Sequence, residues 1–145
     1  MPLKVELAPG ERVIIGDCVL RNGSQRAKFQ VESGGPILRE KDVLTVEVAD
    51  TPAKRIYLAI QLMYLAQDPS PIHHVYLRLI KEIVQAAPST FPYIERISNH
   101  VLTGFLYKAL REAKALIAYE EGLLRHAEPS GARIRPDGAG DGQPA

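Results

Sequence analysis

The chain has 145 residues, which corresponds to one compact domain or two small ones at about 150 residues per domain. Its composition, with 46% hydrophobic and 24% charged residues, is ordinary for a soluble globular protein and excludes wholesale disorder. The formal net charge of +1 excludes a whole-chain electrostatic footprint for nucleic acid or for an anionic membrane, so any polyanion must bind through a local cluster.

The N-terminal residues and the single cysteine indicate an intracellular protein. Lys4 and Glu6 place charges where a signal peptide needs an unbroken apolar core, and no run of the sequence reaches the ~18 apolar residues of a membrane span. Cys18 has no second cysteine in the chain with which to form a disulfide, and a lone cysteine in an apolar run is usually a small buried hydrophobe. We therefore expect a cytoplasmic chain with no membrane partner and with Cys18 buried.

Residues 1–50 are predicted to form a β-strand region. Apolar and polar residues alternate with period two, and turn sequences rich in glycine, proline and asparagine separate the runs. The strands we expect are 3–7, 12–15, 17–21, 26–32 and 37–39. Ala27, Phe29 and Val31 share one face of the fourth strand, which predicts a small antiparallel sheet, barrel-like in form, with one dry and one wet side.

Residues 51–127 are predicted to form a C-terminal α-helical bundle of about four helices, which makes the fold class α+β. Thr51 and Pro52 are typical of a helix start, and residues 56–66 are apolar almost all round apart from Gln61, so we expect this first helix to be central. Further helices are expected from about Ser70, Thr90 and Leu106.

Residues 128–145 are predicted to form a disordered tail. This segment contains four glycines and three prolines but only one aliphatic residue, Ile134. Such a composition buries too little apolar surface to offset the entropy lost on ordering.

Three basic residues of the last helix form a candidate binding surface. The helical region carries nine Lys and Arg against six Asp and Glu, and Lys108, Arg111 and Lys114 recur every third residue. On a helix this spacing gives a strip about 120° wide, from which long side chains can reach a phosphate backbone. The ordinary alternative is a solvated helix face.

Motifs for catalysis or metal binding are not evident. The sequence has no phosphate-binding glycine loop, nucleophile elbow or zinc-protease motif. His73 and His74 are adjacent and would point about 100° apart on a helix, and Glu120-Glu121 is interpreted as a solvated pair. We therefore predict a protein that is not an enzyme, without catalytic residues, metal ligands or a cofactor.

The tyrosines offer a weaker indication of RNA binding. All six lie in the helical region, and their spacing among Leu and Ile favours packing in the core or in an interface. Tyr57 and Tyr107 stand beside basic residues and are the two candidates for stacking on RNA bases.

Several segments resemble the FlbT family of flagellar regulators over residues 1 to about 124. They are MPLKVEL at 1–7, PGERVIIG at 9–16, PILREKD at 36–42, DTPAKRIYLA at 50–59, QLMYL at 61–65, APST at 87–90, LTG at 102–104 and LYKAL at 106–110. The resemblance implies a post-transcriptional regulator of flagellin synthesis that binds the 5′ untranslated region of flagellin mRNA and alters its translation or decay, as a repressor or as an activator. It also implies FlaF as a partner, with flagellin itself as a further candidate.

A second, weaker resemblance is to the carbon-storage regulator family, CsrA. GERVIIGD at 10–17 is similar to its second-strand segment, and Arg39-Glu40 is similar to its RNA-contacting end, while Leu7 stands where that family places a first-strand arginine. Because those proteins form interlocked β dimers, the resemblance implies a homodimer built through the strand region. It makes Arg39, with Lys41 near it, the best candidate for RNA contact.

Other functions remain open from the sequence. The chain could act as a chaperone or adaptor that binds flagellin or FlaF through its helices, or as a structural adaptor of flagellar assembly with neither activity. Arg39 could instead only pair with Glu40, Asp42 or another carboxylate at the end of the sheet.

Overall fold

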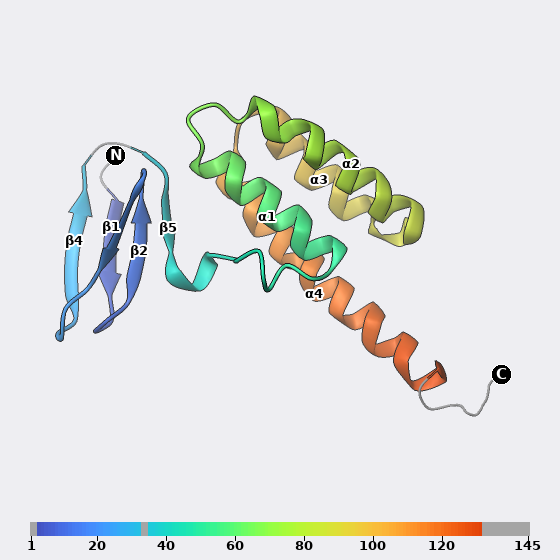
Figure 1. Cartoon of the computed structure of the whole chain (residues 1–145), viewed down its shortest axis with the longest axis horizontal. Coiled ribbons are helices and arrows are strands. Elements are labelled where there is room, and N and C mark those ends of the chain that lie inside the picture. The colour runs from blue at the N-terminus through green and yellow to red at the C-terminus, as the bar shows by residue number, and fades with distance from the viewer. Residues whose placement is uncertain (1–2, 33–34, 132–145) are drawn as a thin grey trace.

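The computed structural model describes residues 3–32 and 35–131, with the strands at one end of the molecule and the helices at the other (Figure 1). The strands are β1 Leu3–Leu7, β2 Arg12–Ile15, β3 Cys18–Arg21, β4 Ala27–Val31 and β5 Ile37–Arg39. The α-helices are α1 Pro52–Leu65, α2 Ser70–Ala86, α3 Phe91–Leu102 and α4 Leu106–Gly131, with short 3₁₀ helices η1 Glu40–Asp42 and η2 Pro88–Thr90. The predicted α+β fold is confirmed.

The strands form two open antiparallel sheets. β1 pairs with β4, and the second sheet has the order β3-β2-β5, so in the described part of the chain the strands do not close into the barrel-like form expected from the sequence. The two sheets pack against each other around the buried side chains of Val5, Leu7 and Val13. Each strand has only three to five residues, so the core that the two sheets enclose is small.

Within the β3-β2-β5 sheet, β2 and β5 contribute side chains to a hydrophobic core on each face. Val13 and Ile37 point to the first sheet, whereas Ile14 and Leu38, which are partners in the β2–β5 register, pack against the helices. Successive side chains of a strand point to opposite faces, so this short sheet belongs to two hydrophobic cores at once. Leu38 is 1% exposed and is the deepest link between them.

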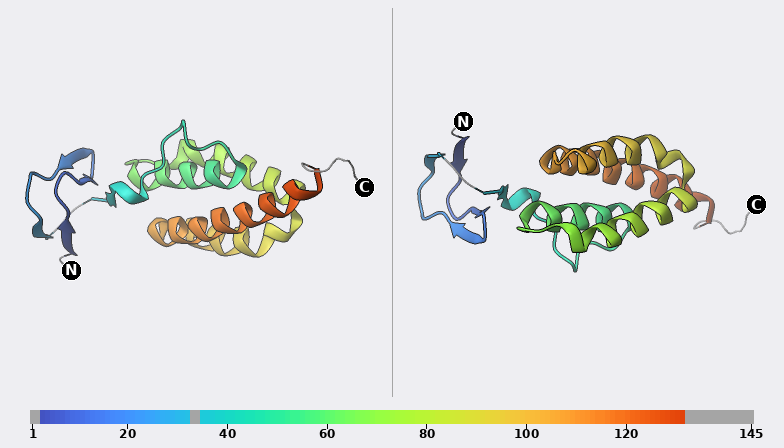
Figure 2. Two further views of the ribbon diagram at one scale, coloured as in Figure 1. Left: turned by 90° about the horizontal axis from the view of Figure 1, so that it is seen from below. Right: turned by 90° about the horizontal axis from the view of Figure 1, so that it is seen from above.

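The helices form two layers, α1 with α2 and α3 with α4 (Figure 2). α1 packs against both α2 and α4, and its residues Ile56, Ile60 and Met63 are fully buried. The prediction that the first helix is central is therefore confirmed. Its N-terminus is capped as the sequence indicates, because the Thr51 hydroxyl accepts a hydrogen bond from the Lys54 amide at 3.3 Å.

Two polar side chains of α1 hold the strand region to the helices. The Tyr64 hydroxyl accepts a hydrogen bond from the Ile37 N–H and donates one to the Ile37 carbonyl, both at 3.1 Å. The Gln61 amide makes the same pair of bonds with Leu44, at 2.8 and 3.0 Å. Here α1 satisfies backbone groups as a neighbouring strand would, which explains why Gln61 interrupts the otherwise apolar stretch 56–66.

Glu120 is buried, and its interpretation as part of a solvated pair was wrong. Its side chain is 7% exposed, and Oε2 accepts a hydrogen bond from the Ala53 N–H at 2.9 Å, at the first turn of α1. A carboxylate is favourable there because the helix dipole and the unpaired N–H groups both attract negative charge. Glu121 is exposed as expected.

Two further expectations differ from the structure. Cys18 is exposed, like the other three residues of β3, because neither hydrophobic core of the described residues includes this edge strand. α4 continues to Gly131 and so includes the first residues of the predicted tail, which begins at residue 128. The remaining residues of that tail, 132–145, lie outside the described residues.

Candidate nucleic-acid interface

Arg39 stands at the end of β5, held on the side that faces β1. Its Nη2 donates to the Glu6 carbonyl at 2.8 Å and to both carboxylate oxygens of Glu11 at 3.2 Å. The Glu11 pKa is lowered, first by the hydrogen bond from the Ala8 N–H and then by Arg39. The Arg39 side chain remains 38% exposed, while its buried Nε has no partner in the described structure.

The acidic partner of Arg39 is Glu11, which is another carboxylate at the end of the sheet as the alternative expects, and is neither Glu40 nor Asp42. Glu40 pairs with Arg12 on the other face of the sheet, and Asp42 contacts the helices. The pair with Glu11 orients the guanidinium without burying it, which leaves part of its donor fork accessible.

A cavity of about 430 Å³ opens beside Arg39, at the junction between the strand region and the helices, and is called the junction cavity below. Its lining residues are Lys4, Val5, Gly35, Ile37, Arg39, Asp42, Tyr64 and Tyr107. The two tyrosine rings lie 5.9 Å apart between centroids at 48°. Burial raises the pKa of Tyr64, whose hydroxyl is occupied by Ile37, whereas Tyr107 is 43% exposed and presents its ring to the cavity.

The predicted basic strip on α4 reaches this cavity through Lys114. Its ammonium contacts the carboxylate of Asp42, which lines the cavity, and the Asp42 carbonyl accepts a hydrogen bond from the Tyr57 hydroxyl. Lys108 lies over the ring of Phe105, 4.9 Å from its centroid, and is exposed. Arg111 is exposed and has no ion pair within the described ranges. Of the strip, Lys114 is therefore the residue that the structure brings to the cavity of Arg39.

Lys41 is exposed and lies apart from this cavity. It lines a separate hollow of about 400 Å³ with Glu40, Glu11 and the turn at Pro9 and Gly10. Glu11 therefore stands between Arg39 and Lys41, so the two predicted residues flank one carboxylate without sharing a cavity.

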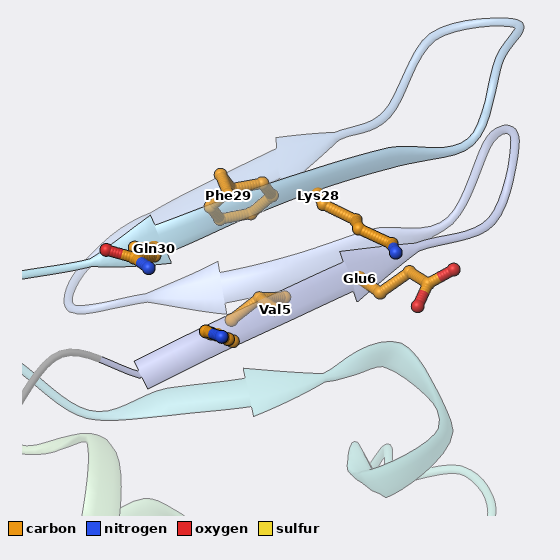
Figure 3. A pocket seen from close by; sticks show the side chains of 6 residues that line it. Val5, Glu6, Lys28, Phe29 and Gln30 are labelled. Carbon is orange, nitrogen blue, oxygen red and sulfur yellow. The ribbon is translucent and has the colours of Figure 1, made fainter.

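Lys4 is a basic residue of the site that the sequence reasoning missed. It lines the junction cavity and also a cavity of about 450 Å³ on the β1–β4 pair, where Phe29 lies near Val5 and Glu6 lies opposite Lys28 (Figure 3). Its position follows from the pairing of β1, which no local pattern at residues 3–7 reveals. Of the two candidate tyrosines, Tyr57 is 3% exposed and belongs to the core, which leaves Tyr107 as the exposed ring.

The described part of the chain contains no group of three or more His, Cys, Asp or Glu side chains that could hold a metal ion. Within the same residues, every helix is too short or too polar to cross a membrane.

Comparisons with known proteins support the resemblance to the flagellar family. The profile of the family described as "Flagellar protein FlbT" matches residues 3–124. A probable flagellum biosynthesis repressor protein FlbT from Bradyrhizobium diazoefficiens is 49% identical over 94% of both chains. One from Rhodopseudomonas palustris is 53% identical over 86% of this chain and 98% of its own length.

A more distant relative is the flagellum biosynthesis repressor protein FlbT of Caulobacter vibrioides, which is 32% identical over 87% of this chain and 92% of its own. No solved structure matches the chain. The family profile spans both the strand region and all four helices up to residue 124, and on that evidence the chain belongs to the FlbT family of flagellar proteins.

Proposed function

We propose that this protein is a post-transcriptional repressor of flagellin expression that binds the 5′ untranslated region of flagellin mRNA and alters its translation or decay. Relatives that align along most of the chain are named flagellum biosynthesis repressors, which supports a regulatory role. Binding to RNA is supported by the junction cavity and its basic surroundings.

The observation that carries the proposal is the contact between Lys114 and Asp42, which brings the α4 strip to the edge of the junction cavity. Sequence-specific RNA recognition uses unstacked bases of single strands, held by aromatic rings and read by polar groups. In this arrangement Tyr107 supplies the ring and Arg39 the part of its guanidinium that is not held by Glu6 and Glu11, which is Nη1. We expect Lys108 and Arg111, which are exposed on α4, to contact the phosphates of the bound strand.

The size of the cavity is consistent with this role. At about 430 Å³ it falls within the range of small-molecule sites and can take one base. Lys114 neutralises Asp42 and Glu11 is paired with Arg39, so Lys4 is the cation of the lining that has no ion pair with the described residues, and it adds positive charge at the cavity.

Salt dependence separates this function from the competing one. In that alternative the protein is a chaperone or adaptor that binds FlaF, the partner we propose from the family resemblance, or flagellin, through apolar helix contacts. Binding to RNA weakens steeply with salt through counterion release, whereas an apolar interface is tolerant of salt.

The strip gives a quantitative test of RNA binding. We expect Lys108→Ala combined with Arg111→Ala to weaken binding of flagellin leader RNA and to lower the slope of log affinity against log salt by roughly 1.4, at about 0.7 per lost phosphate contact. The measurement is a titration of the leader RNA by fluorescence anisotropy at several salt concentrations.

The matched control for this variant is Lys81→Ala combined with Arg125→Ala, which removes the same charge from exposed positions of α2 and α4 outside the strip. An equal loss of slope in both double variants would show that only net charge matters. An unchanged slope in the strip variant would show that the strip is a solvated helix face that does not contact RNA.

We also propose that the protein is a homodimer built through the strand region. β3 leaves one backbone edge unpaired among the described strands, and its side chains Val19 and Leu20 are 64% and 46% exposed. Such an edge favours pairing with another chain. We expect light scattering at micromolar concentration to give twice the 16.0 kDa chain mass, and Val19→Lys to shift it toward the monomer. A monomer mass for the unmodified protein contradicts this.

A further inference from the structure

The α1–α2 layer carries an apolar groove that the proposed RNA site does not use. α1 contributes Arg55, Leu58 and Leu62, spaced i, i+3 and i+7 and therefore on one helix face. α2 contributes Val75 and Leu79 from its own facing stripe, and the groove has a volume of about 280 Å³. The two helices lie together as one layer, on the opposite side of the bundle from α3 (Figure 2).

The apolar side chains of this groove are open to solvent. Leu62 is 48% exposed and Val75 is 40% exposed, while Leu58 and Leu79 form a half-buried floor between them. All of its lining residues belong to α1 or α2, so no other described element covers it. Exposed, contiguous apolar side chains with a polar rim are typical of an interaction surface.

One end of the groove is positively charged. α1 and α2 are joined by the short segment 66–69 and run antiparallel, so Arg55 in the first turns of α1 lies at the same end as Arg78 in the second half of α2. Neither guanidinium has an ion pair or a hydrogen bond with the described part of the chain, and the lining contains no carboxylate. The groove therefore lacks the negative charge that would complement this end.

We propose that this groove binds an amphipathic α-helix of a partner protein, with apolar residues at i, i+3 or i+4 and i+7 and with carboxylates at the end that meets Arg55 and Arg78. The stretch from Arg55 to Leu62 is about 10 Å long, or two helical turns, which matches the length of one such stripe. Placing acidic side chains against the two unpaired guanidiniums fixes the direction in which the helix lies.

Other occupants fit the groove less well. RNA would find two cations but no hydrogen-bonding side chain on the apolar floor between the helices, which leaves its sugars and bases without polar partners. A second copy docked through the same surface would bring four unpaired arginines into one interface without a carboxylate on either lining. The inference does not rest on RNA binding by the junction cavity.

A pair of designed peptides tests the proposal on the full chain. Each is about 16 residues long, so that it is helical, and carries the same leucine stripe; one has two glutamates at the end of the stripe and the other has two lysines. By fluorescence anisotropy we expect the protein to bind the acidic peptide at least about tenfold more tightly. Arg55→Glu combined with Arg78→Glu should reverse this preference, whereas the control Lys81→Glu combined with Arg125→Glu should keep it.

The apolar part of the proposal has its own variant. Val75→Asp places a charge on the exposed rim and should weaken the acidic peptide at least about tenfold, with circular dichroism as the check that the variant is folded. Equal binding of the two peptides, or binding of neither, overturns the proposal. So does displacement of the acidic peptide by single-stranded RNA, or a Val75→Asp variant that changes the mass in light scattering and leaves peptide affinity unchanged.

Discussion

Replacing Leu38 by alanine is expected to lower the free energy of unfolding by about 2–5 kcal/mol, the range found when a fully buried leucine is truncated. Leu38 is 1% exposed and packs into the helical core from the middle of β5. Its loss leaves a cavity between the β3-β2-β5 sheet and α1 and also weakens the docking of the strands on the helices. Denaturant unfolding, followed by circular dichroism, measures the effect.

The control for this variant is Leu102→Ala at the end of α3, where the side chain is 83% exposed and the expected change stays within about 0.5 kcal/mol. If Leu38→Ala lowers the free energy of unfolding as little as Leu102→Ala does, the contact of Leu38 with the helices does not stabilise the fold. A second transition in the unfolding curve of Leu38→Ala, absent from the unmodified protein, would show instead that the two parts separate when the link is weakened.

Replacing Arg39 by alanine is expected to weaken binding of flagellin leader RNA by about 1–3 kcal/mol, roughly 5- to 150-fold, as for the loss of a bidentate contact to a base edge. Stability should change by no more than about 1 kcal/mol, because the pair with Glu11 is partly solvated. Arg39→Lys should not restore affinity, since an ammonium keeps the charge and loses the planar fork.

Arg12→Ala is the matched control, since Arg12 also forms a pair with a glutamate, Glu40, but projects from the opposite face of the same sheet. We expect the Arg12 variant to bind RNA as the unmodified protein does. If both Arg39 variants also bind normally, the role of Arg39 is confined to its bonds with Glu11 and the Glu6 carbonyl, and the RNA site must be sought elsewhere on the helices.

The secondary structure could be predicted because short-range chemistry determines most of it here. The strands follow period-two alternation broken by turn residues, and the start of α1 follows from Thr51 and Pro52. The exposure of Cys18 could not be predicted in this way. An apolar run predicts a strand, but whether that strand lies at an edge depends on which others pair with it, and β3 has β2 on one side only.

The candidate site could be predicted only in pieces. The α4 strip and Arg39 each carry a local signal, but the contacts that organise them join residues far apart in sequence: 28 positions separate Arg39 from Glu11, and 72 separate Lys114 from Asp42. The first pair follows from the pairing of β2 with β5, whereas the second depends on the bonds of Tyr57 and Gln61 that fix the chain after β5 against α1. Two tyrosines with similar local sequence accordingly end in different places, Tyr57 in the core and Tyr107 in the cavity.

The capping of α1 by Glu120 has a consequence for the order of events during translation. The Ala53 amide and the carboxylate that accepts its hydrogen bond are 67 positions apart in the chain. At about 5–20 residues per second the ribosome needs roughly 3–13 s to add that length. During this interval the first turn of the nascent α1 keeps an unpaired amide, so the central helix reaches its final form only when most of α4 has been synthesised.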